Sequence, residues 1–281
     1  MTFKIHALRA AALLALGAAM LPAHATNGYF PHGFGLKAKG MGGTAVALTH
    51  DAFAGVNNPA SAAFVGNRYD IGAEIFLPKR SATVPPAMGG VTVESGKSAF
   101  LIPEFGYNVA LSDKLALGLT VYGNGGMNTS YAPSFGDMNI FGGTGKLGVN
   151  LMQLIVAPTV AYKLADNHSL GLSPLLVYQQ FKASGLQAFA GNSSWTGQVA
   201  YASNTTDNGN DSSKGLGVRL GYTTVLNDAV RFGVSYSPKI NMSRFKKYSQ
   251  LFAESGDFDI PENYAFGVSI QAAPALMLAL D

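Results

Sequence analysis

The sequence has no cysteine and few charged residues. Only 12% of its 281 residues are Asp, Glu, Lys or Arg, about half of the share in an ordinary soluble domain. A chain without cysteine forms neither a disulfide scaffold nor a thiolate metal site. Two of the 19 basic residues, Lys4 and Arg9, lie in the first 25 residues, which contain no acidic residue. The remaining 17 basic and 16 acidic residues give the rest of the chain a net charge of +1. This balance argues against a basic nucleic-acid-binding protein.

The sequence has much glycine and many apolar residues. It contains 34 glycines and 48% apolar residues, with a mean hydropathy of +0.18, which excludes an intrinsically disordered chain. Residues 1–25 are predicted to be a secretory signal peptide: a basic start, an apolar stretch over 10–21, and a small-x-small cleavage site at 23–25. Beyond residue 25 no apolar run is long enough for a transmembrane helix. An exported β-protein, soluble or in the outer membrane, is therefore expected.

From residue 67 onward, apolar residues recur at every second position, which is the period of a β-strand. Eight strands are expected to carry such stripes, and a ninth is expected near the end of the chain. The stripes cover 69–77, 105–111, 115–121, 154–164, 170–178, 216–222, 230–236 and 264–270, and the ninth strand covers 275–280. Between the stripe residues stand small or weakly polar ones, such as Gly217, Arg219, Gly221 and Thr223. Small residues opposite an apolar stripe favour a transmembrane antiparallel β-barrel with its apolar face in lipid.

The connections between the expected strands alternate in length. Short turns are expected at 112–114, 165–169 and 227–229, and long loops at 80–98, 123–149, 183–214 and 239–262. Such alternation is typical of outer-membrane barrels. Tyrosines near the strand ends fit aromatic girdles at the membrane interfaces, namely Tyr122, Tyr162, Tyr178, Tyr236 and Tyr264. Two paired strands keep their apolar stripes on the same side of the sheet only if stripe residues lie opposite stripe residues. This predicts that Leu111 opposes Leu115 and that Leu226 opposes Val230, each across a three-residue loop.

Residues 26–66 differ from the rest, because they are rich in glycine and lack alternation. Their four phenylalanines indicate packing against an apolar surface, so we expect this segment to be a plug, or hatch, inside the barrel. Its glycine clusters do not predict a phosphate-binding loop, since no strand precedes them and no Gly-Lys-Ser/Thr follows. A membrane barrel must close so that no strand edge faces lipid, and bacterial barrels usually have an even number of strands. Nine strands are an odd number, so the chain, which ends at Asp281, is interpreted as truncated.

The segment GFGLKAKGMGGTAVALTHDAFAGVNNPASAAF resembles the start of the FadL/TodX (OmpP1-type) family of outer-membrane transporters for hydrophobic compounds. Further likeness runs through LALGLTVYGNGGMNTSY, VAPTVAYKLADNHSLGLSPLLVYQQFKASG, GLGVRLGYTTVLNDAVRFGVSYSPKI and DIPENYAFGVSIQ. The resemblance implies a plugged barrel of 14 strands, of which about five would be missing here. It also implies passive diffusion of a ligand to a site in the lumen. The ligand would then leave sideways through a gap at a kink in the third strand.

Three groups of residues are candidates for the site. The hatch motif comprises Gly40, Gly42, Gly43, Asn58, Pro59 and Ala60, with the last three interpreted as an anchor of the hatch. The third-strand kink is predicted at Tyr122, Gly123, Gly125 and Gly126, where the alternative is the start of an outer loop. Candidate ligand contacts are Phe30, Phe34, Phe53, Phe105, Lys37 and Lys39, although the two lysines could instead pair within the lumen.

Inward-facing charges form a further prediction. Arg219 and Arg231 are expected to point into the lumen and to pair with Glu74 or Glu104.

The sequence supports uptake of a hydrophobic compound, a long-chain fatty acid or an aromatic hydrocarbon, in the outer membrane of a Gram-negative bacterium. A general porin and a structural or adhesin barrel remain alternatives. An enzyme is not expected, because no nucleophile is spaced to suit His50, Asp51 or His168. We expect no cofactor and no metal. The expected partners are the hydrophobic small molecule and outer-membrane lipid, with no nucleic acid, around a monomeric protein.

Overall fold

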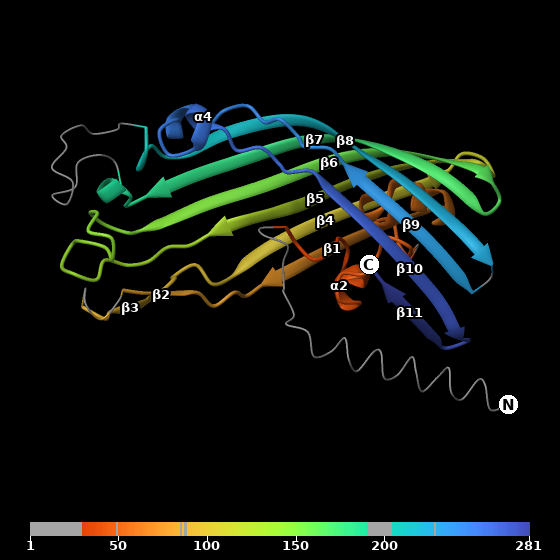
Figure 1. Ribbon diagram of the computed structural model, residues 1–281, viewed down its shortest axis with the longest axis horizontal. Helices are drawn as coiled ribbons and strands as arrows, with labels where there is room; N and C mark the ends of the chain where they lie inside the picture. The colour runs from red at the N-terminus through yellow and green to blue at the C-terminus, as the bar shows by residue number, and fades with distance from the viewer. Residues whose placement is uncertain (1–29, 49, 85, 87–88, 190–203, 228) are drawn as a thin grey trace.

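The computed structural model describes residues 30–281 except 49, 85, 87–88, 190–203 and 228. Nine strands form one antiparallel sheet whose order follows the chain (Figure 1). They are β1 (Arg68–Phe76), β4 (Phe100–Ala110), β5 (Leu115–Asn128), β6 (Gly148–Ala165), β7 (His168–Ser184), β8 (Asp211–Asn227), β9 (Val230–Ser237), β10 (Asn263–Ala273) and β11 (Leu276–Leu280). All nine expected strands are therefore confirmed. Among the described strands, β1 and β11 are the edges of an open sheet.

The remaining elements are short. A hairpin of β2 (Ser81–Thr83) and β3 (Thr92–Glu94) lies in the first long loop. The helical elements are α2 (Leu36–Gly40), α3 (Ala54–Asn57), η1 (Pro59–Phe64), η3 (Gln187–Phe189), η4 (Lys246–Tyr248) and α4 (Ala253–Gly256). Within the described ranges, no helix has the length and apolar character needed to cross a membrane. The predicted signal peptide lies outside the described residues.

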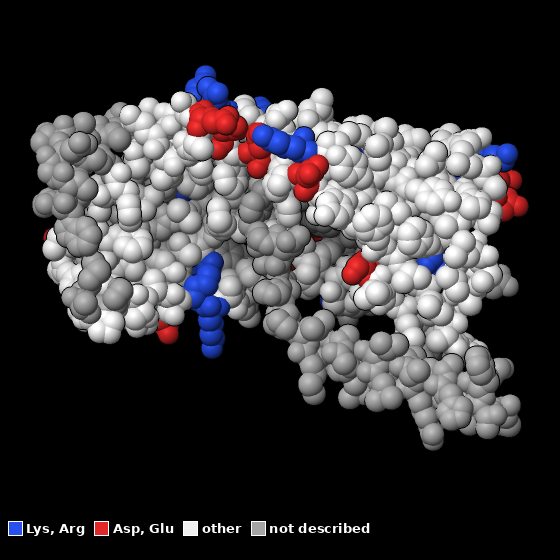
Figure 2. All heavy atoms as spheres, viewed as in Figure 1, with Lys and Arg blue, Asp and Glu red and all other residues white. Residues whose placement is uncertain are grey.

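The apolar stripes point away from the concave side of the sheet. Ile71 in β1 is 77% exposed and Leu216 in β8 is 69% exposed. Every sheet strand except β5 has at least one stripe residue that is 39% exposed or more, and Leu117 of β5 is 37% exposed. Examples are Leu101, Leu154, Leu176, Tyr236, Phe266 and Leu278. So large a continuous apolar surface is unsuited to water. In the view of Figure 2, uncharged atoms cover most of the described surface, and charged side chains gather in a few places.

The register matches one predicted turn and corrects the other. Leu111 N–H donates to Leu115 O at 2.8 Å, and the adjoining pair is Ala110 with Ala116, as the parity argument requires. The predicted pairing of Leu226 with Val230 is wrong, because Val230 pairs with Asn227. A β-bulge between Val225 and Asn227 takes up the extra residue. Beyond it the register restores the expected parity, so the stripe of β8 still faces outward.

Strand β5 extends through the glycine-rich stretch that could also have begun a loop. Its pairing with β6 shifts by one residue between Gly123 and Gly125, so Asn124 is bulged. Gly125 has a φ of 137°, a conformation that residues with a side chain rarely adopt. The glycine-rich stretch therefore contains a bulge inside the strand. The strand continues to Asn128, and the expected loop begins later than residue 123.

Residues 30–48 and 50–66, here called the N-terminal segment, lie against the inner side of the sheet. Ala52 packs on Gly106 of β4, while Val46 packs on Gly267 of β10. One short segment thus touches strands near both edges of the sheet. It follows that the sheet curves around this segment, whose helix α2 is seen between β1 and β11 in Figure 1.

Candidate functional site

Asn58 joins the N-terminal segment to the wall of strands. Its side chain is fully buried, and its Nδ2 donates to Val46 O at 2.9 Å, to Tyr222 O at 3.0 Å and to Thr223 Oγ1 at 2.9 Å. Its Oδ1 accepts from Ala60 N–H at 3.1 Å and so caps η1, with Pro59 in the first turn. Each polar atom of this buried amide is therefore satisfied, as a stable anchor requires.

Glycines of the wall allow the segment to lie directly on the strands. A Cβ at Gly221 would overlap Asn58 Oδ1, and one at Gly171 would overlap the backbone of Pro59 and Ala60. Gly171 and Gly221 are direct partners across β7 and β8. Sequence reasoning placed Gly221 on the inward face but missed its purpose, which is to admit the backbone of another segment.

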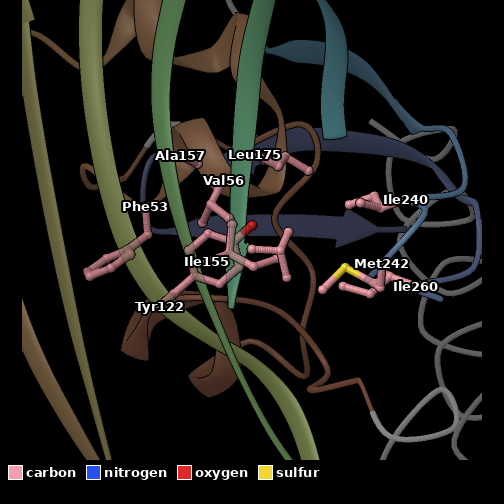
Figure 3. Close-up of a cluster of buried hydrophobic side chains, with 10 residues drawn as sticks. Phe53, Val56, Tyr122, Ile155, Ala157, Leu175, Ile240, Met242 and Ile260 are labelled. Atoms are coloured by element: carbon pink, nitrogen blue, oxygen red, sulfur yellow. The ribbon is translucent and has the colours of Figure 1, made fainter. Parts of the chain in front are cut away.

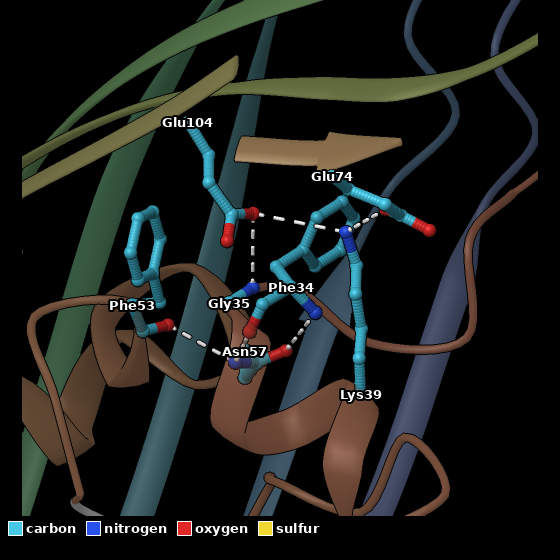
Figure 4. A network of polar contacts seen from close by, with 7 residues as sticks. All are labelled: Phe34, Gly35, Lys39, Phe53, Asn57, Glu74 and Glu104. Carbon is cyan, nitrogen blue, oxygen red and sulfur yellow. Dashed lines mark hydrogen bonds and ion pairs between the residues drawn. The ribbon is translucent and has the colours of Figure 1, made fainter. Parts of the chain in front are cut away.

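A charged network holds α2 at the other end of the segment (Figure 4). Lys39 Nζ lies 2.5 Å from Glu74 Oε2 and 3.8 Å from Glu104 Oε2. Glu104 also accepts from Gly35 N–H at 3.3 Å. Lys39 therefore pairs with acidic residues of the protein, which was the alternative to its contact with a ligand. Lys37 Nζ donates to His50 O at 2.9 Å.

The expected pairing of Arg219 with these acids is wrong. Arg219 lies on the inward face of β8, donates to Val56 O and stands 5.9 Å from the centre of the Phe34 ring. Because Lys39 reaches both Glu74 and Glu104, the two carboxylates are compensated from the N-terminal segment rather than from β8.

An apolar cluster joins the N-terminal segment, the strands and the loop between β9 and β10 (Figure 3). It comprises Phe53, Val56, Tyr122, Ile155, Ala157, Leu175, Val177, Ile240, Met242 and Ile260, with Phe30 and Phe34 packed against it. The prediction that Tyr122 belongs to an interfacial girdle is wrong, since it is 1% exposed and its ring lies 4.6 Å from that of Phe34. Its parity with Ala116 and Thr120, which face inward, was the signal that could have found this.

A cavity of about 400 Å³ lies beside this cluster. The N-terminal segment provides one side of it, including Phe30, Phe34 and Asn57, and the strands and the β9–β10 loop provide the other. Among the wall residues that line it are Ile155, Leu175, Arg219 and the bulged Asn124. The cavity wall therefore mixes apolar residues with polar and charged ones, which include His32, Asn57, Asn124, Arg219, Asn263 and Asp281.

The remaining candidate residues are placed as follows. Phe30 and Phe34 line the cavity, whereas Phe53 is buried in the apolar cluster. Phe105 pairs with Ile71 and Val121 on the outward stripe, away from the cavity. Gly42 and Gly43 line the cavity, and Gly40 ends α2.

The residues that suggested an enzyme are not assembled. His50 lies in the N-terminal segment, where burial, and then the charge of Lys37, lowers its pKa. Burial raises the pKa of the adjacent Asp51. His168 instead stands at the start of β7, with its Nδ1 2.6 Å from Tyr222 Oη. In the part of the chain that the structure describes, no three acidic or histidine side chains are grouped to hold a metal ion.

Comparison with known families matches residues 23–274 to outer membrane protein transport protein (OMPP1/FadL/TodX). The chain belongs to the OMPP1/FadL/TodX family. FadL/TodX-family members are outer-membrane proteins of Gram-negative bacteria and act as transporters rather than as enzymes. No curated protein sequence matches the chain.

Solved structures share the fold. The toluene transporter TbuX of Ralstonia pickettii is 20% identical, with a TM-score of 0.66 over 88% of this chain and 70% of its own. The toluene transporter TodX of Pseudomonas putida is 20% identical, with a TM-score of 0.66 over 90% and 70%. A FadL homologue of Pseudomonas aeruginosa is 17% identical, with a TM-score of 0.59 over 89% and 68%. The chain thus spans about 70% of the length of these FadL/TodX proteins.

Proposed function

We propose that this FadL/TodX protein carries a small hydrophobic compound through the outer membrane by passive diffusion, with the N-terminal segment as its hatch. The observation that supports this most is the cavity of about 400 Å³ between the N-terminal segment and the wall. An apolar cavity of roughly 150 Å³ already holds benzene. The space therefore suits one monoaromatic molecule or part of an acyl chain.

The substrate class comes from the similar proteins together with the cavity. Two of the similar solved structures are toluene transporters and a third is a FadL homologue. We therefore assign an aromatic hydrocarbon or a long-chain fatty acid as the substrate. A general porin would need an open aqueous lumen, whereas Asn58 and the Lys39 network hold a segment of more than thirty residues against the inner wall.

The proposed exit lies at the bulge of β5. Asn124 lines the cavity and occupies the point where the β5–β6 ladder loses its register. A solute that leaves through the wall at this height enters the hydrocarbon core of the bilayer and never crosses water, which is the favourable path for apolar surface. Sideways exit requires the N-terminal segment to shift, because the segment forms one side of the cavity.

A disulfide that ties the N-terminal segment to β8 tests this route. Ser61 Oγ lies 3.3 Å from Thr223 Oγ1, and the natural chain has no cysteine, so Ser61→Cys/Thr223→Cys introduces a single pair. We expect the oxidised variant to lose at least about tenfold in the uptake rate of labelled toluene or palmitate into whole cells of a strain without its own transporter. Reduction should restore the rate.

The matched control joins two strands of the wall and leaves the N-terminal segment free. Thr159 Oγ1 and Ser173 Oγ are 2.6 Å apart on β6 and β7, so Thr159→Cys/Ser173→Cys places a disulfide at a similar buried site. This control should transport normally in both redox states. Unchanged uptake by the oxidised Ser61→Cys/Thr223→Cys protein would contradict a moving hatch, and absence of uptake of both compounds by the natural protein would contradict the proposed function.

A further inference from the structure

The inward face of β6 and β7 changes character in layers along the strands. From the loop end toward the turn end, alternate inward positions carry an apolar residue, a glutamine and an apolar residue: Leu151, Gln153 and Ile155 in β6, and Phe181, Gln179 and Val177 in β7. The apolar residues nearer the loops belong to one buried cluster and those nearer the turns to the cluster that adjoins the cavity. A layer of amides thus separates two apolar regions of the lumen.

The two glutamines are neighbours, and both are buried. Gln153 and Gln179 are direct partners across the β6–β7 ladder and are 3% and 0% exposed. Two polar atoms this deep are expected to have partners, because removal from water is costly for each. Apolar residues of similar size would pack equally well at these two positions, because the neighbouring inward positions of β6 and β7 on either side are apolar.

Each glutamine uses only one end of its amide. Gln153 Oε1 accepts from Asn124 Nδ2 at 3.0 Å, and Gln179 Nε2 donates to Phe258 O at 3.1 Å. The other two atoms, Gln153 Nε2 and Gln179 Oε1, have no hydrogen-bond partner among the described residues. One unpaired donor and one unpaired acceptor therefore stand on adjacent strands at the same height.

We propose that Gln153 and Gln179 recognise one neutral hydroxyl group of the transported solute. A hydroxyl both donates and accepts, so it satisfies Gln179 Oε1 and Gln153 Nε2 together. A carboxylate lacks a proton for Gln179, and a pure hydrocarbon satisfies neither atom.

The position of the pair relative to the cavity supports this specificity. Asn124 lines the cavity and donates directly to Gln153, so one hydrogen bond separates the cavity from the amide layer, whose two glutamines do not line the cavity themselves. The inference rests on the proposed function, since it takes the cavity to be on the path of the solute. It narrows the substrate class to aromatic alcohols in preference to hydrocarbons of the same shape.

Binding of p-cresol and p-xylene tests the inference, because the two molecules differ in a hydroxyl against a methyl group. The mature protein in lipid nanodiscs is dialysed to equilibrium against each labelled compound. In Gln153→Met/Gln179→Met, which keeps the side-chain length, we expect p-cresol to bind about tenfold more weakly and p-xylene to change by less than about twofold. Gln180→Met is the matched control, since Gln180 follows Gln179 in β7 on the other face of the strand, and it should alter neither affinity.

The outcomes separate the two proposals. Equal weakening of both compounds, or unchanged binding of p-cresol, would overturn the hydroxyl site while leaving the transport function intact. Absence of binding of either compound to the natural protein would instead contradict the proposed function. Gln179→Met alone leaves the bond from Asn124 to Gln153 in place, so it gives the same comparison if the double variant fails to fold.

Discussion

The two faces of the sheet follow opposite rules, although they are built from the same strands. In β8, Leu216 and Leu220 point outward, while Gly221 and Thr223 face the N-terminal segment. The outward side chains are large, apolar and exposed, and the inward ones are small or polar and buried. The residue types of the outer face thus suit contact with lipid, and those of the inner face suit close packing of the N-terminal segment. We therefore expect the outer face to tolerate changes of side-chain shape better than a charge, and the inner face to tolerate changes of polarity better than added volume.

The largest effect is expected from a charge on the outward face. Leu220→Arg in the middle of β8 should lower the free energy of unfolding by about 3 kcal/mol, because a cation there lies in the hydrocarbon core. Urea titration of the protein in bilayers measures the change. Leu226→Arg, near the turn of the same strand, is the matched control and should cost less than about 1 kcal/mol. Equal costs at the two positions would break the comparison.

A change of shape on the inward face should have the next largest effect. Gly221→Val places a side chain where Asn58 Oδ1 lies, and such overpacking typically costs about 2 kcal/mol. The N-terminal segment should also become accessible to trypsin at Lys37 and Lys39. Leu220→Val, one residue away on the outward face, should leave both the tryptic pattern and the stability within about 1 kcal/mol of the natural protein. A protected segment in Gly221→Val would refute close docking on this glycine.

The smallest effect concerns pH and the attachment of the N-terminal segment. Burial, and then Lys37, holds the pKa of His50 below its usual 6.5. Since the folded state resists protonation of this ring, the contribution of His50 to stability is complete above pH 6.5. It is lost as the pH falls from 6.5 through the folded pKa. The protection factors of the backbone amides of residues 44–56, which correct for the slower intrinsic exchange at low pH, should therefore fall on acidification from pH 7.5 to pH 5.5, and fall less in His50→Gln. Equal pH dependence in both proteins would exclude this role.

Much of the wall could be predicted from the sequence. Alternation alone placed the nine strands and the direction of their stripes, because a strand has a strict period of two. The turn between Leu111 and Leu115 and the irregularity at Gly123–Gly125 were also predicted. The turn at Asn227 was not, since a bulge there changes the pairing without changing the faces. The alternation of residues along a strand does not reveal a bulge that offsets a shorter turn.

The contacts of the inner face were harder to predict. Nothing near Lys39 in the sequence indicates that it reaches Glu74 and Glu104, because these pairs depend on how the segment folds back onto the sheet. Phe105 was a candidate for ligand binding by residue type, but its parity places it on the outward stripe. Gln153 and Gln179 were overlooked because they interrupt no pattern of alternation. Parity would have identified them as inward polar residues, but not as unpaired ones.

A spin-label scan along β8 tests the difference between the two faces most directly. The natural chain has no cysteine, so single cysteines at positions 216–223 can each carry one nitroxide in the protein reconstituted into lipid bilayers. We predict high accessibility to oxygen, which dissolves in lipid, at the even positions, and low accessibility to both oxygen and a water-soluble nickel complex at the odd ones. Even positions open to the nickel complex, or an absence of alternation, would contradict a lipid-facing outer surface and an inner surface covered by the N-terminal segment.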